Sequence, residues 1–538
     1  MKPGPVRAVS VAPESFRQYR APRSHGDQFV EPAFVDVPEV LAANRKLLAG
    51  YGAPFASLRQ RARREMIDSA LRYTSAYRDV SWVDGDWEAK GTSIIMAGHQ
   101  PALFHPGVWF KNFALSHLAE QTDSIAVNLV VDNDVAAGSS VRIPTIDSAT
   151  GLIRGEAVAY DDAGGGVPYE QTTIRNRETF DHFDQEVLRV VRSLVPDPCV
   201  TRVWEHARAA IARCGVAGCA LAQARHGLEG EIGLKTLELP LGVACRSNAF
   251  AEFALSILME LPRFVQCYND AADSYRKAHG IRSTAHPVPN LSIEDEWFEA
   301  PMWIYGNDSP QRQPAWVKLS GDQLIISDRK DRELKVDTRF PKLAAEQLAN
   351  LVSPNFKLRP RALLTTMYSR LVLSDLFLHG IGGGKYDQLG DMIIGSFFAV
   401  EPPTFMVISA TVQLPESGQQ DAKLETRRLK REIRDSIYQP ERFADQVALS
   451  PDLLKQKQEL ISNVPVRGQR RVWHEQLTKV NGSLSAELTE MREALQQQLN
   501  AASQKIASQA LLASREHPFC VFPLDYLTST YQQLLTAE

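Results

Sequence analysis

Residues 93–134 read SIIMAGHQPALFHPGVWFKNFALSHLAEQTDSIAVNLVVDND, and this stretch predicts the fold of the chain. A short apolar strand, residues 93–97, leads through a turn-rich connection into an apolar helix at residues 108–121. A second strand, rich in β-branched residues, follows at residues 124–134. Strand, helix and strand in this order form a βαβ unit, which predicts a parallel sheet that binds ligands at the carboxyl ends of its strands.

Distant segments are expected to complete this sheet. Residues 371–378 (LVLSDLFL) and 403–412 (PTFMVISATV) are further apolar strand candidates, and helical spacing covers residues 38–76. The sequence therefore predicts an α/β protein with a Rossmann-like parallel-sheet core, inserted connecting domains and a C-terminal α-helical arm. The expected parts are an N-terminal arm and helical lead-in (1–90), the first part of the core (91–138), the inserted domains (139–338), the second part of the core (339–420), a coiled-coil arm (421–514) and a return segment (515–538) with strand and helix character.

Composition narrows the class of protein. The 538 residues carry 60 Lys plus Arg against 64 Asp plus Glu, so no overall positive field favours nucleic acid as a partner. No run of about 18 apolar residues predicts a membrane span, and the first residues lack the apolar segment of a secretory signal. Six cysteines match no common zinc pattern and no disulfide framework, which indicates free thiols and no metal site. We expect a protein of the cytoplasm.

The helical arm carries apolar residues at coiled-coil intervals. A shift of four residues divides the seam, as in a stutter. A turn at residues 463–468 precedes it, so a helical hairpin is expected. The arm either joins two copies into a homodimer or packs only on its own body. The seam residues are Leu477, Leu484, Leu488, Met491, Leu495, Leu499, Ala502 and Ile506.

The connection GHQPALFHPG opens a helix, whose first backbone N–H groups are free to bind an anion. His99 and His105 lie six positions apart in it, and Lys111 follows in the helix. Together they could hold a phosphate or a carboxylate, and His99 could also move a proton. Either histidine alone is more often a hydrogen-bonded loop residue, whereas the two histidines with Lys111 are as consistent with a ligand site as with that alternative.

Two carboxylates end the second strand. Asp132 and Asp134 have the same parity, so they are expected to point to the same side. One of them could bind a ribose or an amine, or act as a base. The alternative is a capping role in the turn that follows.

A glycine-dense loop, HGIGGGK, follows the strand candidate at residues 371–378. It is not a Walker A loop, because His379 stands in place of the first glycine and Tyr386 in place of Ser or Thr. Glycines allow close backbone approach to a ligand, and a lysine adds charge at a helix start. A tight turn without a ligand is the alternative. The residues concerned are Gly380, Gly382, Gly383, Gly384 and Lys385.

A basic turn, SPNFKLRPR, occupies residues 353–361 before a helix. Its Arg359 and Arg361 suit bidentate recognition of a carboxylate or phosphate, and Asn355 could assist. A surface turn is the alternative. Residues 268–291 carry His279 and His286 in a passage from helix to strand, either as ligand contacts or as surface residues.

At these residues the chain resembles the bacillithiol biosynthesis cysteine-adding enzyme family, a family of cysteine ligases. The likeness begins with a G-x-Q-x-x-L-x-x-P loop and a helical lysine, here Gly98, Gln100, Leu103, Pro106 and Lys111. The motif SPN-x-x-x-RP at residues 353–360, the glycine loop and a Pro-led strand at Pro403 follow in the family's order. Residues 268–280 resemble a further family stretch, and the coiled-coil arm is in the expected place.

The resemblance implies a Rossmann-like core, connecting domains and a coiled coil that forms a homodimer. It implies amide formation between the carboxyl group of cysteine and the amine of a glucosaminyl malate, with Gln100 among the substrate-binding residues. Because amide formation in water needs an activated acyl group, a nucleotide such as ATP with magnesium is expected. The chain departs from the family where Val131, Asp132, Asn133 and Asp134 replace an E-D-H-D stretch, and where Lys385 replaces a carboxylate.

Three functions remain open from the sequence. The first is a ligase-like enzyme with a small anionic substrate, in which His99, Asp132 or Asp134 would do the chemistry. The second is a non-catalytic dimeric binding or scaffold protein on the same fold, which the missing histidine favours. The third is a nucleotidyltransferase, which the absence of a K-M-S-K-S-like segment disfavours.

Overall fold

The computed structural model describes residues 16–162, 164–286, 288–351, 353–415, 421–468 and 470–537. The chain forms two compact units. The first, which we call the body, comprises Met1–Ile143, Ala157–Val412 and Arg515–Glu538, and the second, the helical unit, comprises Pro144–Glu156 and Gln413–Ser514. Within the described residues, no helix is long and apolar enough to cross a membrane.

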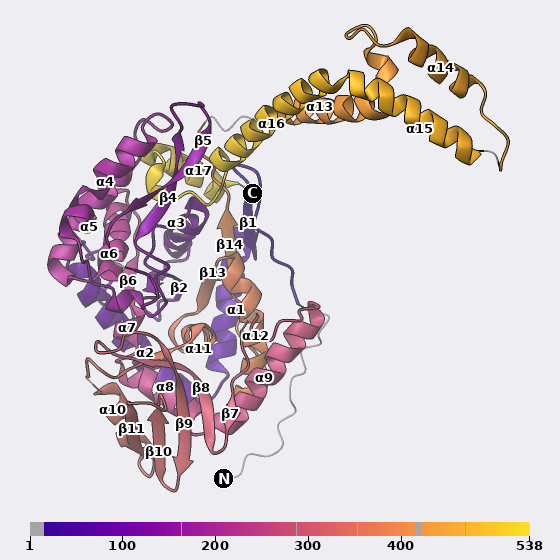
Figure 1. The fold of residues 1–538 in the computed structure, drawn as a ribbon. Helices are drawn as coiled ribbons and strands as arrows, with labels where there is room; N and C mark the ends of the chain where they lie inside the picture. Colours follow the sequence, from indigo (N-terminus) through magenta and orange to yellow (C-terminus); the bar gives the residue numbers. More distant parts are fainter. Residues whose placement is uncertain are drawn as a thin grey trace. The chain divides into compact units, whose positions relative to one another are not determined.

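The body is built around a mixed sheet of six strands with the order β1-β14-β13-β2-β3-β6 (Figure 1). Strands β14 to β6 pair in parallel, and β1 pairs antiparallel with β14 at one edge. The predicted parallel sheet, its βαβ unit and its completion by distant sequence are therefore confirmed. The strands are β1 (Gln28–Glu31), β14 (Met406–Ala410), β13 (Leu376–His379), β2 (Ile94–His99), β3 (Ile125–Val130) and β6 (Leu237–Pro240).

The strand order reverses between β2 and β13. From β2 the chain passes through α3 (Pro106–Gln121) to β3 on one side, and from β13 it passes through α12 (Ile381–Ile393) to β14 on the other. Parallel connections are right-handed, so these two helices cover opposite faces of the sheet. A crevice is expected at the carboxyl ends of β2 and β13, where open α/β sheets bind their ligands.

Helices cover the sheet as the apolar spacing requires. The predicted helical lead-in is confirmed as α1 (Val37–Ala49) and α2 (Ala53–Ser75), which are separated at Gly52 with a φ of +94°. The fully buried Ile67 of α2 belongs to the same core cluster as Leu237 and Leu239 of β6. The other helices of the body are α4 (Arg177–Val191), α5 (Val200–Cys214), α6 (Ala217–Glu231), α7 (Leu241–Ala244), α8 (Asn248–Leu258), α9 (Leu261–Ala278), α10 (Pro341–Ala349), α11 (Ala362–Tyr368) and α17 (Leu524–Thr536).

A second, antiparallel sheet follows α9 in the sequence, with the order β11-β10-β9-β8-β12. Its last strand, β12, is the predicted basic turn, which is extended because Arg359 pairs with Trp303 of β8. The strands are β8 (Trp297–Tyr305), β9 (Gln313–Ser320), β10 (Gln323–Ser327), β11 (Glu333–Asp337) and β12 (Lys357–Pro360), with β7 (Ile293–Glu294) beside β8 and a separate pair, β4 (Ser140–Ile146) and β5 (Ile153–Ala159).

Three local expectations were wrong in whole or in part. The strand expected at residues 371–378 is confirmed only in its second half, as the short β13, because its first half belongs to a π-helical turn, Ser369–Leu373. The glycine loop is the start of a helix, because Gly380 is the N-cap of α12 and the following glycines are helical. The strand expected in the return segment is a 3-10 turn, Phe519–Val521, although α17 does dock against α3 through Tyr531 and Phe113.

The helical unit contains α13 (Asp421–Tyr438), α14 (Pro451–Ser462), α15 (Arg470–Glu487) and α16 (Thr489–Leu512). Helix α13 packs against α16, and α14 packs against α15 across the predicted turn. Val480, Leu484 and Leu488 form a small core with Phe443 and Leu449. Part of the predicted apolar seam is therefore buried inside the unit.

Candidate functional site

A cavity of about 550 Å³ lies at the carboxyl ends of β2, β3 and β13, where the strand order reverses. We call it the switch-point cavity, and all of its lining residues belong to the body. Nine of the predicted site residues line it: His99, Gln100, His105, Lys111, Asp134, Arg361, Gly380, Gly382 and Gly383. The other five, Asp132, Asn355, Arg359, Gly384 and Lys385, do not line it.

His99 ends β2 and is held between two acceptors. Its Nε2 lies 3.1 Å from the Asn112 side-chain oxygen, and its Nδ1 lies 3.0 Å from the Gln100 carbonyl. A protonated ring would satisfy both acceptors, but burial, assisted by Arg225 and Lys111, lowers the pKa of His99 well below its ordinary value. The neutral ring has one proton to donate, so one of the two contacts is not a hydrogen bond.

Lys111 is buried beside the cavity. Its Nζ donates a hydrogen bond to the Gly98 carbonyl at 2.7 Å. Burial, with a smaller contribution from Arg225, lowers the pKa of Lys111 from 10.5 to about 7. A lysine with this pKa exchanges its proton near neutral pH, as catalytic amines do.

Helix α3 starts at the rim of the cavity. His105 is its N-cap, and its Nδ1 accepts a hydrogen bond from the Gly107 backbone N–H at 3.1 Å. A Cβ on Gly107 would lie 2.1 Å from the Ala410 carbonyl oxygen, so this position requires glycine for α3 to start beside the end of β14. Burial lowers the pKa of His105, which leaves the ring able to cap the helix.

A histidine and an aspartate link β13 to α12. Nε2 of His379 lies 2.9 Å from the Asp387 carboxylate, which also accepts hydrogen bonds from Arg370 at 2.7 Å and Thr366 at 2.5 Å. Burial opposes the charge of Asp387, but Arg370 and His379 outweigh it and lower the pKa of this carboxyl well below its usual range. The ionised Asp387 therefore accepts the proton of Nε2 and leaves Nδ1 with a lone pair.

This pairing orients His379 toward the cavity. His379 lines the cavity, and its Nδ1 has no hydrogen-bond partner in the described part of the chain. A Cβ on Gly383 would lie 2.7 Å from Nδ1, so glycine at this position keeps the nitrogen accessible. Burial lowers the pKa of His379, although Asp387 opposes this shift. A neutral histidine held by a carboxylate is suited to accept a proton.

The glycines at the start of α12 have different surroundings. Gly380 and Gly382 have open space where a Cβ would stand, and both line the cavity. Gly384 faces the sheet, where a Cβ would lie 2.5 Å from Val407. Lys385 lines a separate surface pocket with His279 and His286. Of the predicted anion site, only the first turn of α12 lies at the cavity, and Lys385 does not.

The wall opposite the helices carries two arginines around an indole ring. The guanidinium carbon of Arg361 lies 4.0 Å from the ring centroid of Trp303, and that of Arg312 lies 4.9 Å from it. Arg361 forms an ion pair with Glu299, and Arg312 forms one with Asp134 at 3.2 Å. This stacking holds two positive charges at the cavity.

Asp132 and Asp134 do not point to the same side, contrary to the parity argument. Strand β3 ends at Val130, so the alternation of a strand does not extend to these residues. Asp134 accepts a hydrogen bond from Gln100 at 2.8 Å in the cavity. Asp132 instead accepts one from the Gly242 N–H at 2.9 Å, away from the cavity.

Asp132 belongs to a buried charged cluster with Glu170 and Arg359. Nε and Nη2 of Arg359 bind the two carboxylate oxygens of Glu170 at 2.9 and 3.1 Å. Burial, and then the charge of Glu170, raises the pKa of Asp132 to about 7. Burial also disfavours the ionised form of Glu170, but the positive charge of Arg359 outweighs this effect and lowers the pKa of Glu170. Arg359 is thus bound within the protein and, unlike Arg361, does not line the cavity.

Several residues were missed by the sequence reasoning. Asn112 and Trp109 donate to the Glu229 carboxylate at 2.7 Å each, which fixes the amide that faces His99. His379 and Asp387 are eight positions apart, and only the knowledge that α12 starts at Ile381 would have paired them.

The predicted site residue Asn355 lies outside the cavity, where its backbone carbonyl accepts a hydrogen bond from Arg332.

Comparison with known proteins adds no relative. No protein-family model matches the chain, and no curated protein shows significant similarity to it. Among the described residues, no group of three or more His, Cys, Asp or Glu side chains is placed to hold a metal ion.

Proposed function

We propose that the protein is a ligase-like enzyme that joins an amine to a carboxylate-derived acyl group in the switch-point cavity. The resemblance noted in the sequence suggests cysteine and an amino-sugar conjugate such as glucosaminyl malate as the pair, or a related acyl and amine pair. The observation that carries this proposal is the oriented, neutral His379 in a cavity lined by Lys111 and Arg361.

His379 would act as the general base. The ammonium group of the incoming amine loses one proton to Nδ1, the freed nitrogen pair forms a bond to the acyl carbon, and the nitrogen then loses its second proton to water to give the neutral amide. The leaving group departs with the electrons of its bond to that carbon. Asp387 keeps Nε2 protonated and so holds the ring in the tautomer that can accept this proton.

The cationic groups would hold the anionic parts of the substrates. Arg361 and Arg312, each already paired with a carboxylate, would offer their remaining N–H groups on one wall, and the first turns of α3 and α12 would offer backbone N–H groups. The open space at Gly380 and Gly382 fits a phosphate group, as in a nucleotide such as ATP with magnesium. Such a nucleotide would supply the activation of the acyl group.

The same proposal extends to the architecture. The core would be Rossmann-like, with its ligand site at the switch point. The helical unit would be a coiled-coil arm through which two copies form a homodimer. The non-catalytic binding protein remains the rival, because Asn133 stands where the family has a histidine and instead donates to the Pro360 carbonyl.

The experiment is mass spectrometry of the full chain incubated with cysteine, glucosaminyl malate, ATP and magnesium. We expect a product with the mass of the amide, formed at least about 100-fold more slowly by His379→Gln. His182→Gln, on the surface of α4, is the matched control and should leave the rate unchanged. Unchanged turnover in His379→Gln would show that His379 is not the general base. If a folded wild-type chain forms no product, cysteine and glucosaminyl malate are not its substrates.

A further inference from the structure

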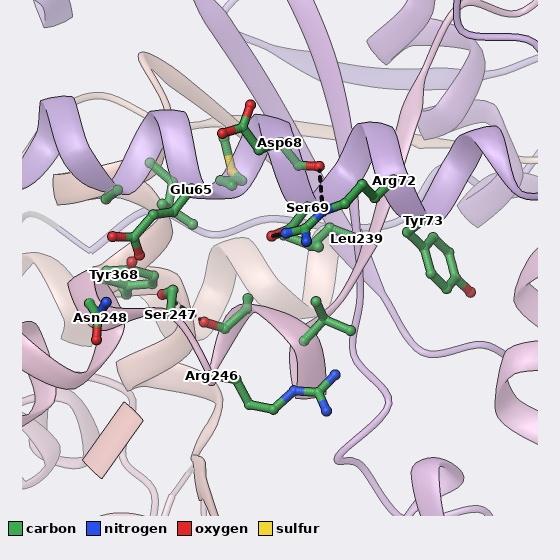
Figure 2. Close-up of a pocket in the computed structure, with 15 residues that line it drawn as sticks. Glu65, Asp68, Ser69, Arg72, Tyr73, Leu239, Arg246, Ser247, Asn248 and Tyr368 are labelled. Carbon is green, nitrogen blue, oxygen red and sulfur yellow. Dashed lines mark hydrogen bonds between the residues drawn. The ribbon is translucent and has the colours of Figure 1, made fainter. Parts of the chain in front are cut away.

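A second cavity, of about 620 Å³, lies between α2 and the turn from α7 into α8 (Figure 2). One wall is a stripe of α2 with the spacing of a helix face: Glu65, Asp68, Ser69 and Arg72. Arg246 and Asn248 contribute to the opposite wall. In the described part of the body, no residue lines both this cavity and the switch-point cavity.

Two arginines, Arg72 and Arg246, line the cavity, and neither forms an ion pair with any described residue. Arg72 donates from Nε to the Asp68 carbonyl and from Nη2 to the Ser69 hydroxyl, both at 3.3 Å, and both acceptors are uncharged. The Arg246 side chain makes no ion pair or hydrogen bond with any described residue. Figure 2 shows these two side chains on opposite walls. A guanidinium group without an ion-pair partner is suited to bind a carboxylate.

The other end of the cavity is acidic. Oε2 of Glu65 accepts a hydrogen bond from the Ala249 N–H at 3.1 Å, which leaves the other oxygen of the carboxylate available. Figure 2 shows Glu65 beside Tyr368, Ser247 and Asn248, on the N-terminal side of Arg72 along α2. A carboxylate among hydroxyl and amide groups can bind an ammonium group.

The floor between the two ends is apolar. Leu239, Val243 and Ala244 line it on one side, and Met66 and Leu373 on the other. An apolar floor with one cationic and one acidic end complements a molecule that carries a negative charge, a short neutral body and a positive charge.

The spacing of these residues along the axis of α2 indicates the size of that molecule. Arg72 reaches back to Ser69, which is one helical turn, or about 6 Å, from Glu65 along α2. Two extended residues span about 7 Å. We propose that this cavity is a binding site for a dipeptide-sized zwitterion, with its carboxylate between Arg72 and Arg246 and its ammonium group at Glu65.

This site does not depend on the proposed function of the switch-point cavity. Its test is isothermal titration of the full chain with Ala-Ala, N-acetyl-Ala-Ala and Ala-Ala-amide. The two blocked peptides each lack one charge. We expect Ala-Ala to bind with a stoichiometry of one and each blocked peptide to bind at least about tenfold more weakly.

Three substitutions test whether Ala-Ala binds in this cavity. Arg246→Gln should weaken Ala-Ala at least about tenfold, whereas Arg192→Gln, at the exposed C-cap of α4, should not change it. Glu65→Gln should weaken Ala-Ala and leave N-acetyl-Ala-Ala unaffected, with thermal melting as the check that α8 is intact. Absence of Ala-Ala binding, equal binding of the blocked peptides, or unchanged binding by Arg246→Gln would each overturn the proposal.

Discussion

At the residue scale, burial shifts the ionisable groups of the switch-point cavity toward their neutral forms. It lowers the pKa values of His99, Lys111 and His379, although the two histidines would otherwise be partly charged and the lysine fully charged near neutral pH. Two arginines that line the cavity, Arg312 and Arg361, are held by ion pairs with Asp134 and Glu299. The cavity thus combines guanidinium groups held by ion pairs with groups that can exchange a proton, which a condensation of an amine with an acyl group needs.

The ionisation of Lys111 predicts a pH-dependent stability. Its pKa falls from 10.5 in the unfolded chain to about 7 in the folded protein, so its stabilising contribution is present above pH 10.5 and is lost as the pH falls toward 7. Below pH 10.5 the folded protein therefore bears a free-energy cost for the charge of the buried Lys111, and Lys111→Met removes this cost. At about 1.4 kcal/mol per pKa unit, the variant should gain about 3–4 kcal/mol of stability relative to wild type between pH 10 and pH 6.

Denaturant unfolding of both proteins at the two pH values measures this gain. Comparing the two pH values cancels the constant cost of the hydrogen bond that the Gly98 carbonyl loses. Lys342→Met, at an exposed position of α10, is the control and should show no such pH dependence. An equal stability difference at both pH values would mean that Lys111 keeps an ordinary pKa.

At the element scale, the start of α12 shows what the sequence could and could not predict. The glycine cluster was identified as a close-approach segment, and the cavity does use Gly380, Gly382 and Gly383. Its helical conformation was missed because four glycines in six residues predict a loop from local preferences alone. Helix formation here follows from packing, since Gly384 is buried against Val407.

This contrast predicts opposite effects on stability within one helix. Gly384→Ala should destabilise the protein by about 1–3 kcal/mol, because its Cβ would lie 2.5 Å from Val407. Gly382→Ala meets open space and should stabilise α12 by up to about 1 kcal/mol. Thermal or denaturant unfolding of both variants measures the difference. If both alanines have the same effect, Gly384 does not pack against β14 as described.

The βαβ unit was predictable because its signals are local: apolar runs of strand length flank an apolar helix in β2, α3 and β3. The charged pairs of the site could not be predicted from local signals. Glu170 is 189 positions from Arg359, and Asp387 is 17 positions from Arg370. Only the folded chain brings such partners together, so the sequence predicted Arg359 as a substrate contact when it is already bound to Glu170.

At the scale of the whole molecule, the helical unit determines whether the proposed homodimer can form. The predicted seam is partly used up within the unit, because Leu484 and Leu488 are fully buried in its own core. Four exposed apolar side chains of the described part of the unit lie near the turn between α14 and α15, namely Ile461, Val464, Val466 and Val472, whereas Ile146, Leu424, Ile437 and Tyr438 are exposed elsewhere in the unit. Neighbouring exposed apolar side chains of this kind often mark an interface.

We therefore predict that the homodimer depends on this turn rather than on the seam. The double substitution Val466→Asp and Val472→Asp should convert the dimer to a monomer in light scattering coupled to size-exclusion chromatography, because each places a charge in an apolar contact. Val35→Asp, at an exposed valine of the body, should leave the dimer intact. Leu484→Ala should instead lower the stability of the helical unit by about 2–5 kcal/mol through the cavity that it leaves. A wild-type monomer would refute the homodimer itself, and a dimer that survives the double substitution would assign its interface to another surface.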